Sequence, residues 1–107
     1  MYLIQLLLPA PGRGAADDSG PALARTRTEL VERFGGVTAY IQTPAVGEWT
    51  SPEGDRERDR VVMVEVVTPT FDRIWWRSYA ATLAGRFHQD AIHLRALPVE
   101  MLDPDAA

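Results

Sequence analysis

Short apolar runs alternate along the chain with stretches in which apolar residues recur at helical spacing. The runs are rich in leucine, valine and isoleucine and predict strands, whereas spacings of three, four and seven residues predict helices. In chain order we expect strands over residues 2–8, 37–43, 59–68 and 91–97, with helices over residues 21–34 and about 71–88. This order is the split βαβ arrangement. It predicts an α+β fold, a ferredoxin-like βαββαβ sandwich with two helices on one face of a four-stranded antiparallel sheet, in strand order 4-1-3-2.

Glycine, proline and polar residues mark the ends of these elements. Ser19 or Gly20 is expected to cap the first helix, and the pair Gly35-Gly36 to end it. The second strand is expected to stop at a proline, before a long polar loop over residues 44–58 whose alternating charges are solvated. The core-facing residues expected in the second helix are Trp76, Ala80, Leu83 and Phe87, with Trp75 at the helix margin.

Strand alternation separates two faces of the predicted sheet, because successive side chains of a strand point to opposite sides. The purely apolar set should face the helices: Ile4, Leu6, Leu8, Val37, Ala39, Ile41, Val62, Val64, Val66, Ile92 and Leu94. The other set, on the open face, mixes apolar residues (Leu3, Leu7, Val61, Met63 and Val67) with polar ones (Gln5, Tyr40, Glu65, His93 and Arg95). A sheet face open to water is normally polar, so this half-apolar face is expected to be covered. A second copy of the chain is the simplest cover, and we predict a homodimer.

The polar residues of the open face are the sharpest candidate site, because the strand order could bring them together across the sheet. The candidate ligand-binding residues are Gln5, Tyr40, Glu65, His93 and Arg95, together with Trp49. One interpretation is a small-molecule site in which Glu65 or His93 acts as a general base and Arg95 holds an anion. The alternative is a satisfied polar network inside a dimer interface. Trp49, an aromatic residue in a polar loop, is expected either to close a pocket or to dock on a partner.

Composition and charge argue against several classes of function. The chain has 107 residues, 46% of them hydrophobic, which suits one domain over residues 1–107. Its net charge is −4, whereas proteins that bind nucleic acid or anionic membranes carry excess base, so neither partner is expected. With no cysteine and two distant histidines, no metal site is expected, and no cofactor either. Since no stretch is typical of a membrane span or a signal peptide, we expect a cytoplasmic protein.

Two stretches of the chain resemble a family of small bacterial proteins of unknown function. They are residues 32–40 (Glu-Arg-Phe-Gly-Gly-Val-Thr-Ala-Tyr) and residues 47–49 (Gly-Glu-Trp), and the resemblance covers residues from about 29 to 97. The layout is also similar to the dimeric α+β barrel group, in which two such sheets pack face to face. That group includes cofactor-free oxygenases, isomerases and dismutases, and also non-catalytic proteins. The resemblance therefore implies a fold and a dimer and leaves two functions open: a dimer that binds a small molecule, as an enzyme or otherwise, and a non-catalytic interaction dimer.

Overall fold

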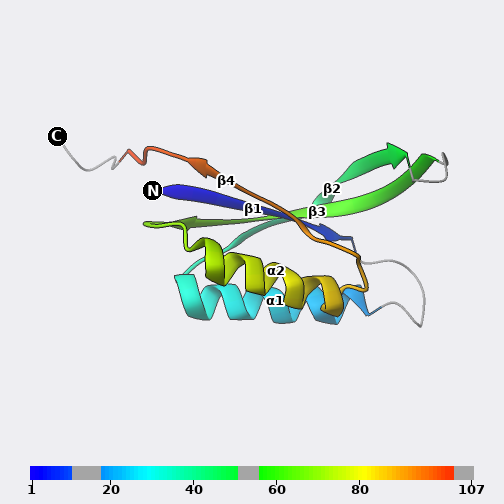
Figure 1. Cartoon of the computed structure of the whole chain (residues 1–107), viewed down its shortest axis with the longest axis horizontal. Coiled ribbons are helices and arrows are strands. Elements are labelled where there is room, and N and C mark those ends of the chain that lie inside the picture. Colours follow the sequence, from blue (N-terminus) through cyan, green and yellow to red (C-terminus); the bar gives the residue numbers. More distant parts are fainter. Residues whose placement is uncertain (11–17, 51–55, 103–107) are drawn as a thin grey trace.

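Two helices lie against one side of a four-stranded sheet (Figure 1). The computed structural model describes residues 1–10, 18–50 and 56–102, and the side chains of residues 39–50 and 56–60 are outside the described part. The elements are strand β1 (Tyr2–Pro9), helix α1 (Ser19–Phe34), strands β2 (Thr38–Thr50) and β3 (Arg56–Thr68), helix α2 (Arg73–Arg86) and strand β4 (His93–Pro98). Neighbouring strands pair antiparallel in the order β2-β3-β1-β4, which is the expected order read from the opposite edge. The α+β, ferredoxin-like layout is the one that the sequence predicts.

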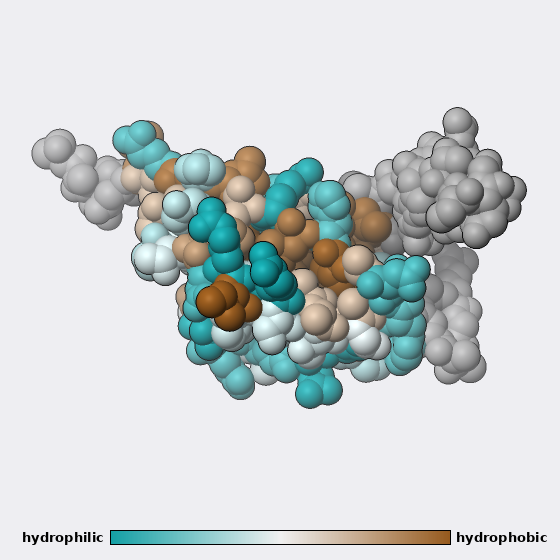
Figure 2. Space-filling model, in the orientation of Figure 1, coloured by the Kyte–Doolittle hydropathy of each residue, from teal (hydrophilic) through white to brown (hydrophobic). Residues whose placement is uncertain are grey.

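The core fills the space between the sheet and the helices, and the alternation of the two central strands determines its composition. The helix-facing residues of β1 and β3 are buried: Ile4, Leu6, Leu8, Val62, Val64 and Val66. The helices add Ala22, Leu23, Leu30, Trp76 and Leu83, and the C-cap of α2 adds Phe87. On the edge strand β4, Leu94 and Ala96 pack against this core but are only partly buried. Figure 2 accordingly shows apolar surface along the seam between β4 and α2.

The helix ends follow local chemistry, with small corrections to the predicted starts. Helix α1 begins at Ser19 with Asp18 as its N-cap, so the prediction of Ser19 or Gly20 as the cap was wrong by one or two residues. At the other end, Gly35 adopts a left-handed φ of 82° and its N–H bonds to the Val31 carbonyl at 2.8 Å, as expected of a terminating glycine. Helix α2 starts after Asp72, whose side chain accepts the Trp75 N–H at 3.1 Å.

Helix α2 also ends earlier than expected, at Arg86. His88 follows it in a left-handed conformation with φ 56°, and the Gln89 N–H bonds to the Ala84 carbonyl at 2.8 Å. This wrap-around bond has the pattern of a Schellman motif, in which the left-handed position usually holds glycine.

Of the described helices, neither is long and apolar enough to cross a membrane.

Strands β2 and β3 are longer than the sequence predicts. The expected loop over residues 44–58 was wrong, because residues 44–50 and 56–58 continue the two strands as a paired hairpin. The pairing register shifts between Tyr40, opposite Met63, and Ala45, opposite Val61. Pro44 lies in this interval. A proline has no N–H to donate to a regular ladder, but at a break in the pairing no ladder bond is lost, so it is tolerated there. Figure 1 shows the hairpin extending past the helical layer.

The aromatic residues of α2 pack against the end of α1. Trp76 is buried and stacks on Phe34, with ring centroids 5.1 Å apart. Trp75 is partly exposed and stacks on Tyr79 at 4.8 Å, while the Arg33 guanidinium carbon lies 4.0 Å from its ring centroid. The expectation of Trp76 in the core and Trp75 at the helix margin is confirmed. This cluster joins the two helices next to the Gly35 turn and so positions the start of β2.

Candidate functional site

A row of three polar side chains crosses the open face of the sheet. The strand register places Gln5 directly opposite Glu65 of β3 on one side and Arg95 of β4 on the other. The Gln5 amide nitrogen donates to the Glu65 carboxylate at 2.7 Å, and its oxygen accepts from Arg95 Nε at 2.6 Å. The amide thus presents its donor to the anion and its acceptor to the cation. We call Glu65, Gln5 and Arg95 the polar row.

Two less polar rows flank the polar row along the strands. On one side lie Val67, Leu3 and Leu97, and on the other Met63, Leu7 and His93. Val67 and Leu97 expose 38% and 40% of their surface. Gln5 also touches the second of these rows, since its amide nitrogen lies 3.6 Å from the Met63 sulfur. The open face therefore alternates apolar and polar rows, and no helix covers it in the described part of the chain.

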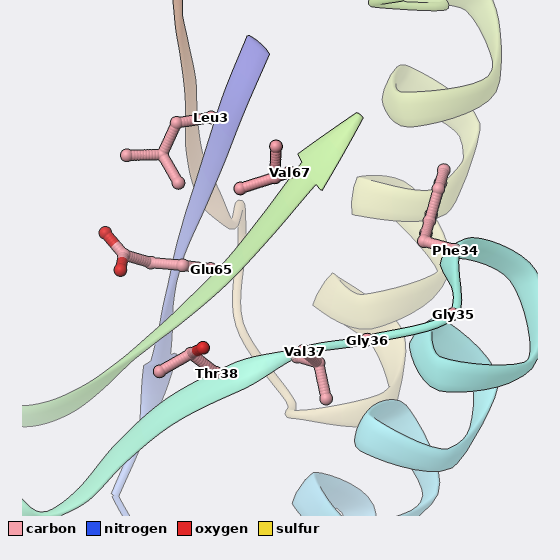
Figure 3. Close-up of a pocket in the computed structure, with 8 residues that line it drawn as sticks. All are labelled: Leu3, Phe34, Gly35, Gly36, Val37, Thr38, Glu65 and Val67. Atoms are coloured by element: carbon pink, nitrogen blue, oxygen red, sulfur yellow. The ribbon is translucent and has the colours of Figure 1, made fainter. Parts of the chain in front are cut away.

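A shallow hollow of about 480 Å³ opens beside Glu65, where β2 enters the sheet. Strand β2 begins at Thr38, opposite Glu65, so β3 continues beyond this point with β1 alone as its neighbour. The lining residues are Leu3, Glu65 and Val67 of the open face and the segment from Phe34 to Thr38. In Figure 3, Leu3, Glu65 and Thr38 point to the same side of the sheet. The hollow therefore combines a carboxylate and a hydroxyl with apolar walls.

The structure brings together three of the six predicted site residues. Gln5, Glu65 and Arg95 form the polar row. His93 is exposed and lies opposite Leu7 in the neighbouring row, with β1 between it and Glu65. Among the described contacts there is no hydrogen bond between His93 and Glu65, and the place between Glu65 and the β4 residues is taken by Gln5.

The two aromatic candidates can be placed only by their backbone. Tyr40 pairs with Met63 in the sheet, and Trp49 pairs with Glu57 far out on the hairpin. Their side chains are outside the described residues, so their predicted roles stay predictions. Trp49 lies in a strand and not in the expected loop.

A second polar cluster, which the sequence reasoning missed, joins the two helices. Arg86 donates from Nη1 to Glu29 Oε1 at 2.6 Å and from Nη2 to Glu29 Oε2 at 3.0 Å, a bidentate pair. The Tyr79 hydroxyl donates to the same carboxylate at 2.9 Å, and Arg86 also reaches the Thr26 hydroxyl at 3.0 Å. We call Thr26, Glu29, Tyr79 and Arg86 the helix clip. Its one signal in the sequence is Thr26, a polar residue between Leu23 and Leu30 on the apolar face of α1.

The pKa values of the helix clip follow from these contacts. The hydrogen bond from Arg86 lowers the pKa of Glu29, and the same bond raises the pKa of Arg86. Burial, followed by the bond to Glu29, raises the pKa of Tyr79 well above its usual range. All three shifts favour the ionisation states in which the cluster is fully bonded.

In the described residues, no buried polar side-chain atom lacks a partner, and no cluster of three acidic, histidine or cysteine side chains could hold a metal ion.

Comparison with known proteins gives a likeness of fold. No family model matches the chain, and no curated protein matches it. Among solved structures, the chain is similar to a crystal structure of a point mutant of CutA1 from Pyrococcus horikoshii OT3. The TM-score is 0.60 at 17% sequence identity, over 98% of this chain and 89% of that chain. The similarity extends over nearly the whole chain and shows a shared ferredoxin-like α+β fold.

Proposed function

We propose that this protein is a self-associating α+β domain whose open sheet face is the contact surface between copies, with a homodimer as the simplest assembly. The observation that supports this most strongly is the polar row, bonded within itself and flanked by two less polar rows. In this proposal the assembly is the functional form, and the face serves recognition between copies of the chain.

Burial of the open face is favourable for its apolar residues. Val67 and Leu97 expose apolar surface next to Leu3, on a sheet with helices on the other side only. Removing apolar surface from water contributes roughly 25 cal/mol per Å². A small domain buries a limited fraction of its own surface, so covering this face would add stability that the single chain does not have.

Burial is also compatible with the charges of the face. A charged group removed from water is strongly unfavourable unless it is paired and hydrogen-bonded. Gln5 already bonds to both Glu65 and Arg95, so each charge keeps a partner when the face is covered. A hydrogen-bonded row of this kind suits the inside of an interface better than an isolated charge would.

The proposal is tested by the mass of the particle in solution. Size-exclusion chromatography with light scattering, at micromolar concentration, should give at least twice the 11.9 kDa mass of the chain. Met63→Asp should weaken the assembly, because an unpaired buried charge costs roughly 3–5 kcal/mol. Ile74→Asp is the control, since Ile74 is 83% exposed on helix α2, away from the open face.

Two outcomes would contradict the proposal. One is a monomer for the unaltered chain at these concentrations. The other is an assembly that Met63→Asp leaves intact, which would place the interface elsewhere. A mass above twice that of the chain would replace the dimer by a larger closed ring, and the effect of Met63→Asp would then decide whether the open face is its interface.

A second candidate function is the binding of a small molecule in the hollow beside Glu65. The observation that favours it is the lining of the hollow, a carboxylate and the Thr38 hydroxyl next to apolar side chains. Such a site suits a ligand with a hydrogen-bond donor for Glu65 and an apolar body for Leu3 and Val67. Ligand-observed NMR against a panel of small amines tests it, and displacement of a bound amine by Val67→Trp would locate the site. Amine binding that this substitution leaves unchanged would rule out the hollow.

A further inference from the structure

The two ends of the polar row carry opposite charges, with the neutral Gln5 between them. The carboxylate lies one strand away on β3 and the guanidinium one strand away on β4, in the same row of the sheet. Because neighbouring strands are about 4.8 Å apart, the two backbones that carry the charges are about equally distant from Gln5 on opposite sides. The direction of the symmetry axis of an assembly therefore determines whether like or opposite charges of two copies face each other.

Two open faces can be stacked by a twofold axis that lies between the sheets and passes over Gln5, and the two possible directions of this axis have opposite electrostatic outcomes. If the axis runs along the polar row, each residue meets its own copy, so Glu65 faces Glu65 of the partner subunit. Like charges brought together in this way are strongly unfavourable. If the axis runs parallel to β1, the two sides of the row are exchanged. Glu65 then faces the partner's Arg95, and Arg95 faces the partner's Glu65.

The flanking rows agree with the second arrangement. An axis parallel to β1 keeps every row opposite the same row of the partner, so Val67 faces the partner's Leu97 and Leu3 faces its own copy. The apolar row therefore covers an apolar row. With the axis along the polar row, the row of Leu3 would instead lie over the row of Leu7, which contains His93.

Arg95 retains hydrogen-bonding capacity for such a contact. Its Nε donates to Gln5, and within the described part of the chain its two terminal nitrogens make no hydrogen bond. A guanidinium has five N–H donors in a planar fork, and the pair of terminal nitrogens can meet a carboxylate in a bidentate manner. The Arg95 side chain is exposed on the edge strand β4, where it can reach across to a facing sheet.

We propose that Glu65 of one protomer pairs with Arg95 of the partner subunit, twice per dimer, around a twofold axis parallel to β1. This inference rests on the proposed self-association through the open face and specifies its partner, a second copy of the same chain in one orientation. The polar row then selects the alignment of the two sheets, and the apolar rows supply most of the contact area.

Separate charge reversals test the pairing between chains. Glu65→Arg gives a chain with two positive ends of the row, and Arg95→Glu gives a chain with two negative ends. Each variant alone should self-associate more weakly, on the order of tenfold or more, because like charges meet across the axis. An equimolar mixture should form heterodimers with an affinity near that of the unaltered chain, measured by native mass spectrometry with one variant isotope-labelled.

A matched pair of reversals controls for attraction between chains of opposite net charge. Glu32→Arg on α1 and Arg77→Glu on α2 reverse exposed charges away from the open face. Their mixture should show no preference for heterodimers. Circular dichroism and melting temperature establish that all four variants remain folded.

The outcomes separate this inference from the proposed function. A mixture of Glu65→Arg and Arg95→Glu that associates as weakly as either variant alone overturns the pairing between chains, and so does full self-association of each variant. If Met63→Asp weakens the assembly in the same series, the open face remains the interface and only the orientation is refuted. If Met63→Asp has no effect, the proposed function itself has failed.

Discussion

Removing the guanidinium of Arg86 should cost the fold about 2 kcal/mol at neutral pH. The Arg86 side chain is 10% exposed and donates two hydrogen bonds to Glu29 and one to Thr26, and the Glu29 side chain is 34% exposed. An exposed ion pair contributes about 0–1 kcal/mol, whereas hydrogen bonds to charged groups contribute about 1.5–3 kcal/mol. The expected loss lies in the lower part of the second range because Glu29 remains partly hydrated. Arg86→Met keeps most of the buried aliphatic volume and removes these bonds.

The loss should depend on pH in a defined direction. The pKa of Glu29 is lowered from its ordinary value of 4.5, chiefly by the bond from Arg86. A carboxyl group with a lowered folded-state pKa contributes stability above its unfolded-state pKa and loses it as the pH falls through the folded-state pKa. The difference between the unaltered chain and Arg86→Met should therefore be largest near pH 7 and shrink below about pH 4.5.

Thermal unfolding at constant protein concentration measures both effects. At pH 7 the melting temperature of Arg86→Met should fall by about 8–12 °C, since 1 kcal/mol corresponds to several degrees in a domain of this size. Arg25→Met is the control, because Arg25 contacts the same carboxylate at 3.6 Å but is 70% exposed and should cost less than about 1 kcal/mol. An equal loss at pH 7 and below pH 4 would show that packing, and not the ion pair, stabilises this contact. A loss as large for Arg25→Met would refute the argument from burial.

Two backbone positions give further predictions. Gly35→Ala should destabilise the fold by about 1 kcal/mol, because a Cβ is disfavoured at its φ of 82°. Gly36→Ala is the control and should change stability little, because Gly36 has no such φ. Chemical denaturation of both variants checks this, and equal losses would contradict it. His88→Gly should be more stable than His88→Ala by about 1 kcal/mol. Both substitutions remove the exposed 3.0 Å contact of His88 with Asp18, so their difference in melting temperature reports only the left-handed backbone at φ 56°, and no difference would refute the strain.

The sheet could be predicted from the sequence because its central strands carry a strong alternation. Val62, Val64 and Val66 share one face and are buried, and the same rule places Gln5 and Glu65 on the other. The strand order then brings Gln5 between its two charged neighbours. These steps depend on the period of a strand and on topology, both of which are properties of short segments of sequence.

The hairpin could not be predicted in the same way. Residues 44–50 and 56–58 extend β2 and β3 past the helical layer, where the strands pair with each other and neither α1 nor α2 lies over them. A two-stranded ribbon of this kind does not require one apolar face, so charged residues such as Arg56 and Glu57 are compatible with it. Pro44 also predicts a loop when the sequence around it is considered alone, although the register shift in the pairing accommodates it within the strand.

The helix clip lies beyond local analysis for a different reason. Glu29 and Arg86 are 57 residues apart and meet because of the angle and rotation at which α1 and α2 pack on the sheet. Helix periodicity assigns a residue to a face but does not determine which residue of a second helix lies opposite it. The presence of Thr26 on the apolar face of α1 indicates a polar contact there without identifying the partner.

The position of Gln5 bears most directly on the choice between catalysis and assembly. Glu65 or His93 was the predicted general base on the open face, and the two lie in different rows with β1 between them, so they do not form one acid–base pair. Gln5 occupies the intervening place and bonds to Glu65 and Arg95, so each charged side chain of the row has a hydrogen-bond partner within one chain. In the proposed dimer the partner's Glu65 would bind the terminal nitrogens of Arg95, and the unequal ends of the row would give the second protomer a preferred orientation. In the proposed dimer, the partner over the open face would also add a wall to the hollow beside Glu65, so a ligand site there would depend on assembly.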